Sequence, residues 1–209
     1  MKRYGLDHLV YATPDLDSSV DTLAELTGAP IEKGGSHPGW GTRNALVGLG
    51  TGTYFEIIGP DPHQPEPPGP RPFLIDDLKK ARLVTWAYRH PDPEQAHEIL
   101  TALGIQLGPV RSKSRTRPDG TSLSWKLTEP KPLVGGGVIP FLIDWGATPH
   151  PSSLLPSPCT LVHFEGRHPD SDRLQPALDA LGANLSISVG PTPGLTALLS
   201  TPRGEIELN

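Results

Sequence analysis

One pattern occurs three times along this chain and limits what the chain can fold into. Each copy has an extended apolar stretch, a Pro-Asp turn, an amphipathic stretch and a glycine: "DHLVYATPDLDSSVDTLAELTGA", "LVTWAYRHPDPEQAHEILTALGI" and "TLVHFEGRHPDSDRLQPALDALGAN". In the first copy, Val20, Leu23 and Ala24 recur at helical spacing, which predicts a helix that ends at Gly28. Each copy is therefore expected to be a strand followed by a helix.

Further strand-like runs follow each predicted helix. They are "NALVGLG" and "TYFEIIG" in the first segment, "SLSWKLTEP" and "VIPFLIDWG" in the second, and "LSISVG", "LTALLST" and "GEIELN" in the third. Short runs of apolar and β-branched residues bounded by glycine or proline are typical of strands. The repeating unit is therefore β-α-β-β-β, which predicts an α+β fold built from about three such modules.

Clusters of proline and glycine separate the modules. The run "GPDPHQPEPPGPRP", residues 59–72, cannot be a helix interior or a central strand, because proline lacks the amide donor and fixes φ. The run "GATPHPSSLLPSPC" is also rich in proline and equally unsuited to a helix interior or a central strand. We expect a first module over residues 1–60, a linker over 61–80, a second module over 81–146, a linker over 147–157 and a third module over 158–209.

Composition excludes several classes of function. A net charge of -5 with scattered lysines and arginines gives no basic face for nucleic acid. No apolar run reaches the length of a membrane span, and the first residues lack the apolar centre of a signal peptide, so we expect a cytoplasmic protein without a membrane partner. The single cysteine, Cys159, excludes an intramolecular disulfide and a cysteine-rich zinc site.

The order of elements and several motifs resemble a known superfamily. The repeated module, the opening "DHLVYATPDL" and the run "YFEII" look like the vicinal oxygen chelate superfamily, which includes glyoxalase I, extradiol dioxygenases, epimerases and bleomycin-resistance proteins. More narrowly, "HPGWGTRNALVGLG", "SRTRPDGTSLSWKL" and "PFLIDWGATPHPS" are similar to glyoxalase-like domain proteins. The resemblance implies paired modules that form a curved mixed sheet around a cleft, with the helices outside. It also implies a small-molecule substrate or ligand and is compatible with a homodimer.

In that superfamily, residues of the first and last strands of each module hold a divalent metal inside the cleft. Carried onto this sequence, the resemblance implies His8 and Glu56 as ligands, with Glu56 also catalytic. Strand alternation agrees, since it places Leu6, His8 and Val10 on one face, and Tyr54, Glu56 and Ile58 on one face. The alternative is that Glu56 pairs with Arg43 in the neighbouring strand and that His8 is a hydrogen-bonded core histidine.

The remaining metal ligands depend on which modules pair. Counting from the Pro-Asp turn, the third module offers His163 and Glu207, whereas the second offers Thr85 and the pair Ile143-Asp144. The set His8, Glu56, His163 and Glu207 would suit Zn²⁺, Fe²⁺, Mn²⁺ or Ni²⁺. We expect the first and second modules to pair, because consecutive elements tend to be neighbours in space. In that case only His8, Glu56 and at most Asp144 remain, and a bound metal would not be tight.

Other polar and aromatic residues are candidates for binding a substrate. "HPGWGTRNA" offers His37, Trp40, Arg43 and Asn44, with glycines that let the backbone approach a ligand closely. Arg115 and Arg117 precede a Pro-Asp-Gly turn, and arginine forks bind carboxylates and phosphates. Lys113 reads as part of a solvated hairpin tip. Trp125 reads as core or cleft wall, and stacking on a bound substrate is its alternative role.

Two classes of function stay open from the sequence. The first is a metal-dependent lyase, isomerase or dioxygenase that acts on a small oxygenated molecule, with Glu56 or Glu207 moving a proton. The second is a metal-free binding protein of the bleomycin-resistance type, whose groove is lined by aromatic residues and arginines. The number of acidic and histidine side chains that converge in the cleft distinguishes the two classes.

Overall fold

The computed structural model describes residues 4–116 and 122–209 of the chain. Helices and strands follow the predicted order in all three modules. The first module has β1 (Gly5–Ala12), α1 (Leu16–Thr27), β2 (Glu32–His37), β3 (Thr42–Gly48) and β4 (Tyr54–Pro60). The second has β5 (Arg82–Arg89), α2 (Pro93–Ala102), β6 (Val110–Thr116), β7 (Ser122–Thr128) and β8 (Phe141–Asp144). The third has β9 (Thr160–His168), α3 (Ser171–Leu181), β10 (Ile187–Val189), β11 (Gly194–Thr201) and β12 (Gly204–Leu208).

The Pro-Asp turns work as helix starts in the first two modules. Asp15 caps α1 by accepting a hydrogen bond from the backbone N–H of Ser18, and Asp92 caps α2 in the same way from Gln95. Such a cap satisfies one of the free N–H groups at a helix N-terminus. Gly28 ends α1 in the left-handed conformation with φ 67°, which glycine adopts without a steric penalty.

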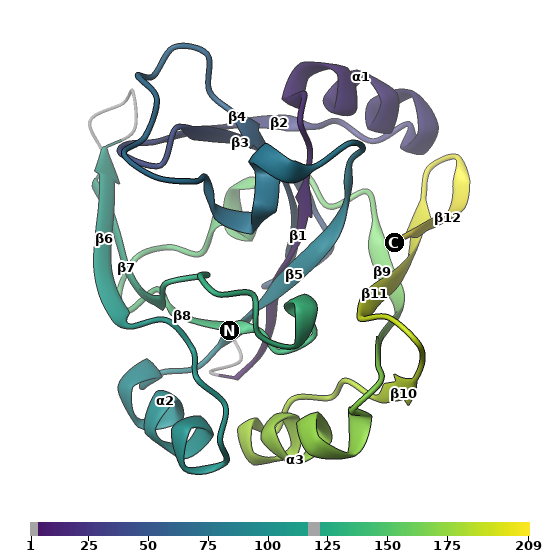
Figure 1. Cartoon of the computed structure of the whole chain (residues 1–209). Coiled ribbons are helices and arrows are strands. Elements are labelled where there is room, and N and C mark those ends of the chain that lie inside the picture. The colour runs from purple at the N-terminus through teal and green to yellow at the C-terminus, as the bar shows by residue number, and fades with distance from the viewer. Residues whose placement is uncertain (1–3, 117–121) are drawn as a thin grey trace.

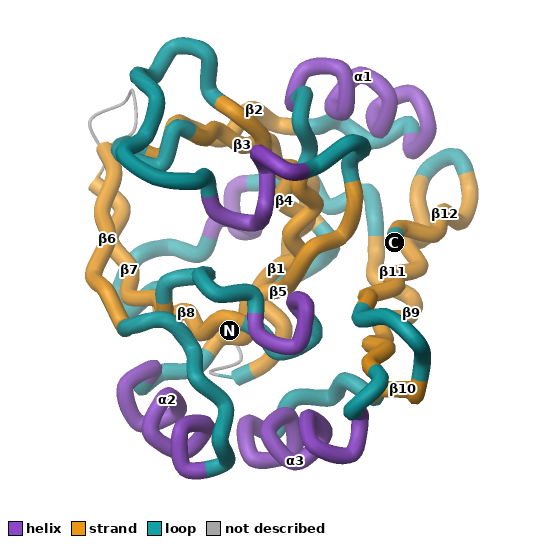
Figure 2. The backbone as a smooth tube through the Cα atoms, in the orientation of Figure 1, coloured by secondary structure: helices purple, strands orange, loops and turns teal. Residues whose placement is uncertain are grey.

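The first two modules share one mixed sheet of eight strands in the order β2-β3-β4-β1-β5-β8-β7-β6. The first strand of each module lies parallel to the last strand of the same module, and the antiparallel pair β1 and β5 joins the modules. The sheet curls into an open half-barrel, with α1 and α2 on its outside (Figures 1 and 2). The expected curved sheet around a cleft is confirmed, and the first module pairs with the second.

The third module has the same element order but a different strand order. Its sheet runs β10-β9-β11-β12, so β11 separates the first strand from the last. In the first two modules those strands are neighbours. The third module therefore does not reproduce the strand arrangement that surrounds the cleft in the first two.

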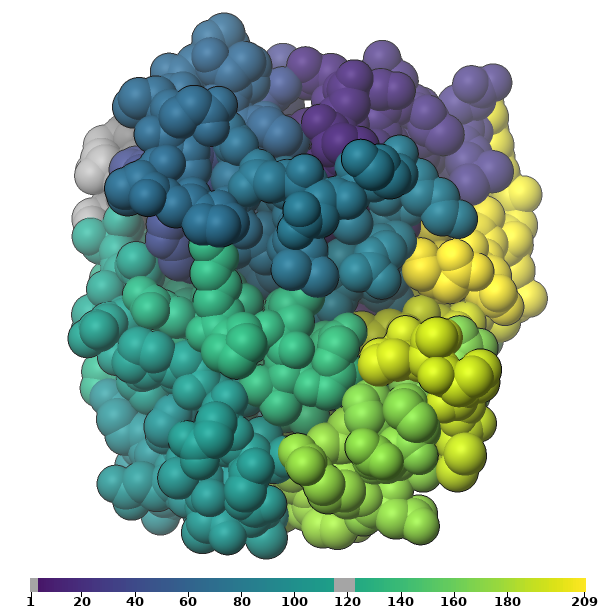
Figure 3. All heavy atoms as spheres, viewed as in Figure 1, coloured from purple at the N-terminus to yellow at the C-terminus, as the bar shows by residue number. Residues whose placement is uncertain are grey.

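Apolar side chains pack on both faces of the curled sheet. On the outer face, Leu9, Ile57 and Leu142 pack with residues of the helices and of the third module. Trp86 of β5 meets Phe164 of β9 edge-on at 5.5 Å, which fixes the third module against this face. In the space-filling view the third module, green to yellow, lies directly against the first two (Figure 3). The inner face carries a second apolar cluster that includes Val10, Ala87 and Ile143, and this cluster borders the cleft.

The helices of the described residues are all too short or too polar to cross a membrane. Cys159 is buried in the outer core, and this burial raises the pKa of its thiol. A raised pKa disfavours the thiolate that a nucleophilic cysteine requires.

Candidate functional site

A pocket of about 160 Å³ lies in the concave face of the eight-stranded sheet. Both paired modules contribute to its wall, and so does the linker between them, through Phe73. Phe73 has a positive φ of 62°, a conformation that is uncommon for a bulky residue and often found at functional sites. The lining is largely aromatic and apolar, with a few polar groups: His8, Ser36, His37, Pro38, Trp40, Asn44, Leu46, Tyr54, Glu56, Ile58, Phe73, Lys113, Ser114, Trp125, Leu127, Pro130, Phe141, Ile143, Trp145 and Pro151.

The curl of the sheet brings its two edges together over the pocket. Trp40 lies in the turn between β2 and β3 at one edge, and Lys113 lies on β6 at the other. The Lys113 ammonium sits 4.9 Å from the centre of the Trp40 ring, within the range of a cation–π contact. Lys113 is therefore a pocket residue, and its interpretation as part of a solvated hairpin tip was wrong.

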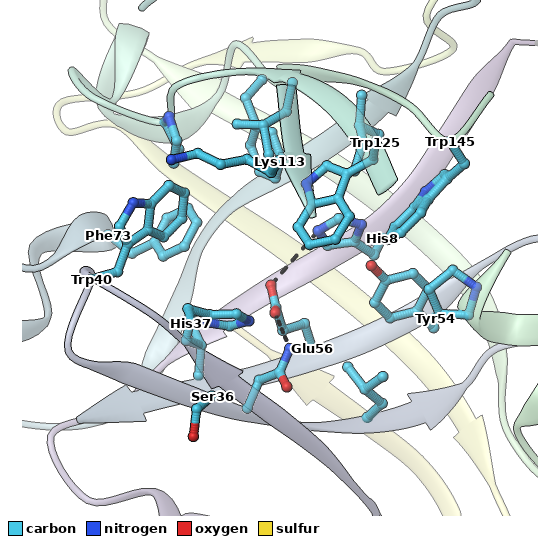
Figure 4. Close-up of a pocket in the computed structure, with 18 of the residues that line it drawn as sticks. His8, Ser36, His37, Trp40, Tyr54, Glu56, Phe73, Lys113, Trp125 and Trp145 are labelled. Atoms are coloured by element: carbon cyan, nitrogen blue, oxygen red, sulfur yellow. Dashed lines mark hydrogen bonds and ion pairs between the residues drawn. The ribbon is translucent and has the colours of Figure 1, made fainter. Parts of the chain in front are cut away.

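Glu56 projects into this pocket from the middle of β4. Tyr54, Glu56 and Ile58 line the pocket, while Phe55 and Ile57 pack in the outer core, as strand alternation predicts. The Oε1 atom of Glu56 accepts a 2.5 Å hydrogen bond from Nδ2 of Asn44. Its other oxygen, Oε2, lies 3.6 Å from Nε2 of His8 (Figure 4). One carboxylate oxygen is thus anchored, and the second faces the histidine.

His8 lines the pocket from β1 and is held from behind by the residue before it. Its Nδ1 atom lies 2.8 Å from Oδ1 of Asp7. Neighbouring residues of a regular strand point to opposite faces, but a register shift between Leu6 and His8 breaks the alternation here. As a result Leu6 packs in the outer core, although alternation predicted that it would share the face of His8.

Asp7 is fully buried and carries a group of polar contacts. Its Oδ2 atom accepts a 2.8 Å ion-paired hydrogen bond from Nε of Arg89 and lies 3.1 Å from Nε2 of His150. The indole N–H of Trp145 also points to this carboxylate, at 3.2 Å from Oδ2. Burial acts to raise the pKa of Asp7, but hydrogen bonds to His150 and His8 outweigh it and hold the pKa well below its usual range.

An ionised Asp7 determines which nitrogen of His8 carries hydrogen. A carboxylate can only accept, so Nδ1 of His8 must donate to it, and Nε2 is the atom that faces Glu56. The ring is fixed further by Tyr54, which stacks on it at 4.5 Å, and by Phe141, which meets it edge-on at 5.5 Å. Asp7, His8 and Glu56 therefore form a line of polar groups that ends in the pocket.

The structure places the predicted substrate-binding residues in different locations. Four of them line the pocket: His37, Trp40, Asn44 and Trp125. Arg43 does not, because it follows Thr42 and precedes Asn44 on β3 and so points to the other face. There its guanidinium lies 2.7 Å from Asp17 of α1, and it does not pair with Glu56 as the alternative interpretation proposed. Arg115 lies on β6, and Arg117 lies outside the described residues.

The candidate metal ligands other than His8 and Glu56 lie away from the pocket. Asp144 accepts a hydrogen bond from the backbone N–H of Gly146, whereas its neighbour Ile143 lines the pocket. His163 and Glu207 belong to the four-stranded sheet of the third module; His163 is exposed and lies 3.2 Å from Glu165. Glu207 is exposed on β12, two strands away from β9.

The register of the sheet explains why the second module supplies no ligands. His8 is the partner of Tyr54, and in the second module Ala87 is the partner of Phe141. Ala87 is therefore the counterpart of His8, rather than Thr85, whose hydroxyl donates to the backbone of Gly137. In the described part of the chain, no cluster of three or more His, Cys, Asp or Glu side chains is arranged to hold a metal. His8 and Glu56 are two donors, which does not fit the four-ligand site that the resemblance implied.

Sequence reasoning missed the polar group behind His8. Asp7 and Arg89 lie on paired strands. Trp145 and His150 come from the run "DWGATPHP", for which the sequence suggested no role beyond its similarity to the family. A fully buried carboxylate beside a histidine is recognisable only once the register shift at β1 is known. The available signal was the adjacent pair Asp7-His8 at the start of a strand.

Comparisons with known proteins agree with this architecture. The profile of the glyoxalase-like domain family matches residues 6–182. A hypothetical protein from Staphylococcus aureus has a similar solved structure, with a TM-score of 0.63, 12% identity and coverage of 91% of this chain and 88% of that chain.

Two further solved structures are less similar. Methylmalonyl-CoA epimerase from Mycobacterium tuberculosis gives a TM-score of 0.44 at 21% identity, over 68% of this chain and 88% of that one. A Streptomyces coelicolor methylmalonyl-CoA epimerase variant in complex with 2-nitronate-propionyl-CoA gives 0.44 at 18% identity, over 70% and 97%. No curated protein matches the sequence. Because the family profile spans most of the chain, the chain belongs to the glyoxalase-like domain family.

Proposed function

We propose that this protein is an isomerase or lyase that moves a proton on a small oxygenated substrate, with Glu56 as the base. The observation that carries the proposal is the pair formed by Glu56 Oε2 and His8 Nε2, 3.6 Å apart in an aromatic pocket. Two titratable groups that face each other in a cleft, each held by a further residue, are typical of general acid–base sites.

Glu56 is positioned to take a proton from carbon. Asn44 anchors Oε1 and leaves Oε2 directed at the pocket, so the carboxylate keeps one orientation. A C–H bond next to a carbonyl is the acidic bond in such a substrate. Glu56 takes that proton, and the C–H electron pair moves through the new C=C bond to the carbonyl oxygen.

His8 is positioned to donate a proton to the substrate oxygen. Both of its ring nitrogens face carboxylates, Asp7 at Nδ1 and Glu56 at Nε2, so the ring can carry a proton on each. The Nε2 proton passes to the oxygen and gives an enol. Return of a proton to carbon, at the same or a neighbouring position, completes a tautomerisation or isomerisation, or prepares the loss of a leaving group.

The proton transfers proposed above use only side chains of this chain. His8 and Glu56 would be the two side chains that hold a divalent ion, and the ion would supply Lewis-acid polarisation of a substrate oxygen. The second module offers Ala87 and Ile143 where two further ligands would be needed. The chain's own Asp7, His8 and Glu56 are therefore the basis of the proposal.

A binding protein without chemistry is the second candidate, because one observation favours it. The pocket presents mostly aromatic and apolar surface, including Trp40, Trp125 and Trp145, to a bound molecule. Such a wall suits sequestration of a planar ligand whether or not a proton moves. In that case Glu56 and His8 would act only as hydrogen-bonding groups.

Deuterium exchange separates the two candidates. Phenylpyruvate and its neutral methyl ester both carry an acidic CH₂ next to a carbonyl and an aromatic ring that suits the pocket. In D₂O, we expect the wild-type protein to accelerate loss of the CH₂ proton signal of at least one of them. The Glu56→Gln variant should lose about 100-fold or more of that acceleration, the usual size of an acid–base contribution.

The control is Glu165→Gln, the same change at an exposed glutamate of the third module. It should exchange at the wild-type rate. A wild-type protein that accelerates neither compound, or a Glu56→Gln variant that keeps the full rate, would show that the protein does not transfer protons by this pair.

A further inference from the structure

Lys113 differs from several other cations of the described residues, which are paired with carboxylates. Arg43, Arg71 and Lys126 each lie within 2.8 Å of a carboxylate oxygen, and all three paired carboxylates are on or near the outer surface. Within residues 4–116 and 122–209, Lys113 forms no such ion pair, and its ammonium lies over the Trp40 ring instead. A cation at a pocket wall without a carboxylate partner is available to an anionic group of a ligand.

Among the residues that line the pocket, Lys113 is the one lysine or arginine in the described part of the chain. Glu56 is the one acidic residue in that lining. Figure 4 shows Lys113 and Glu56 on different sides of the pocket, with Trp40 and Trp125 flanking the space between them. A ligand with one anionic end therefore has a preferred orientation, with its charge toward Lys113 and away from Glu56.

The space between these two charges suits a flat ring. Trp125 and Trp145 lie with ring centres 5.4 Å apart, and Phe73 and Phe141 form another part of the wall with centres 6.1 Å apart. Aromatic faces and edges of this kind bind a planar ring through offset-stacked and edge-to-face contacts. A pocket lined by a single lysine and by a buried carboxylate suits a monoanionic carboxylate better than a doubly charged phosphate.

We infer that the pocket takes small aromatic carboxylates, with the carboxylate at Lys113, the ring against the tryptophans and the carbon that loses its proton next to Glu56. The placement of the reacting carbon rests on the proposed function; the recognition of the aromatic acid does not. The inference assigns a substrate class to the site and gives Lys113 the role of binding the substrate's charge.

Calorimetric titration with two unreactive probes tests this inference. 3-Phenylpropionate and 3-phenylpropanamide have nearly the same shape, but only the first is anionic at pH 7. We expect the carboxylate to bind the wild-type protein about tenfold more tightly than the amide, the size of one charge-assisted contact. In Lys113→Gln the two probes should bind within about twofold of each other, because only the carboxylate loses a partner.

The matched control is Lys126→Gln, on the neighbouring strand. Lys126 pairs with Glu94 of α2 outside the pocket, so this variant should keep the tenfold preference. Equal binding of the two probes to the wild-type protein, no binding of either, or an unchanged preference in Lys113→Gln would each overturn the inference.

The same titration distinguishes failure of the inference from failure of the proposed function. Glu56→Gln should still prefer the carboxylate, since Lys113 is intact, even though its deuterium exchange is lost. If the preference for the carboxylate is present but no variant or wild-type protein exchanges deuterium, the substrate class stands and proton transfer is wrong. If exchange depends on Glu56 but the preference is absent, proton transfer stands and the role of Lys113 is wrong.

Discussion

Asn44 donates a 2.5 Å hydrogen bond from Nδ2 to Oε1 of Glu56, and this contact fixes the one acidic side chain of the pocket lining in the described residues. Asn44 is itself held, because its Oδ1 atom accepts a hydrogen bond from the backbone N–H of Gly35. The amide therefore has one orientation, with its oxygen toward β2 and its NH₂ toward Glu56. This contact makes the geometry of the base depend on residues outside the pocket.

Gly34→Ala should disturb the base from a position that does not itself line the pocket. A Cβ at position 34 would lie 1.9 Å from Oδ1 of Asn44, so the amide must move. We expect proton exchange to fall by about tenfold or more, since small displacements of a catalytic group are costly, while the chain stays folded by circular dichroism. Gly69→Ala is the control, because a Cβ there meets nothing within 4 Å. An unchanged exchange rate in Gly34→Ala would contradict the anchoring role of Asn44.

Asp7→Asn should strongly destabilise the protein. It removes the carboxylate charge that pairs with Nε of the buried Arg89. Breaking a buried ion pair from one side costs about 3–5 kcal/mol in free energy of unfolding. Urea denaturation measures this loss. The double variant Asp7→Asn/Arg89→Met should be less destabilised than the sum of the two single variants, whereas simple additivity would show that the two side chains are not coupled.

The lowered pKa of Asp7 in the folded protein also makes stability depend on pH. Its folded pKa is held below the ordinary value of 3.8, so the unfolded chain takes up a proton first as the pH falls. The stability that Asp7 contributes is fully present above pH 4 or so and is lost as the pH falls through the folded pKa. Urea midpoints measured from pH 6 to pH 3 should therefore decrease, and they should decrease less in Asp7→Asn. An equal decrease in both proteins would show that other carboxylates dominate.

Metal content tests the interpretation of His8 and Glu56 as two isolated donors. We expect purified protein, dialysed against buffer without chelator, to hold well under one equivalent of Zn, Fe, Mn or Ni, because tight sites of this kind use three or four protein ligands. Elemental analysis by mass spectrometry gives this number. About one equivalent that disappears in His8→Gln would show that a metal is held at this pair and that further ligands were overlooked.

Much of the fold could be predicted from the sequence because the signals are local. The Pro-Asp turns start helices since the aspartate caps them, as at Asp15 and Asp92, and the strand alternation around Glu56 follows from the backbone pleat. The same alternation excludes Arg43 from the pocket once Asn44 faces it. The proximity of Lys113 to Trp40 could not be predicted, because it arises when a curled sheet brings two distant edges together.

Two other features depend on register and on strand order, which the sequence does not specify. The shift between Leu6 and His8 in the pairing of β1 with β5 puts Asp7 next to the His8 ring. The third module repeats the order of elements, but β10 pairs with β9, and β11 separates β9 from β12. His163 and Glu207 thus match the expected ligands in sequence spacing without occupying the equivalent places in a sheet.

A crystal structure of the protein with bound 3-phenylpropionate shows most directly whether Lys113 holds the carboxylate of an aromatic acid in the pocket of Glu56. We expect the ring to lie among Trp40, Trp125 and Trp145, with the carboxylate within about 4 Å of Nζ of Lys113. We also expect the carbon chain to run toward Oε2 of Glu56 and Nε2 of His8. A ligand bound outside this pocket, or one whose carboxylate replaces Glu56 as the partner of His8, would show that the proposed binding mode is wrong.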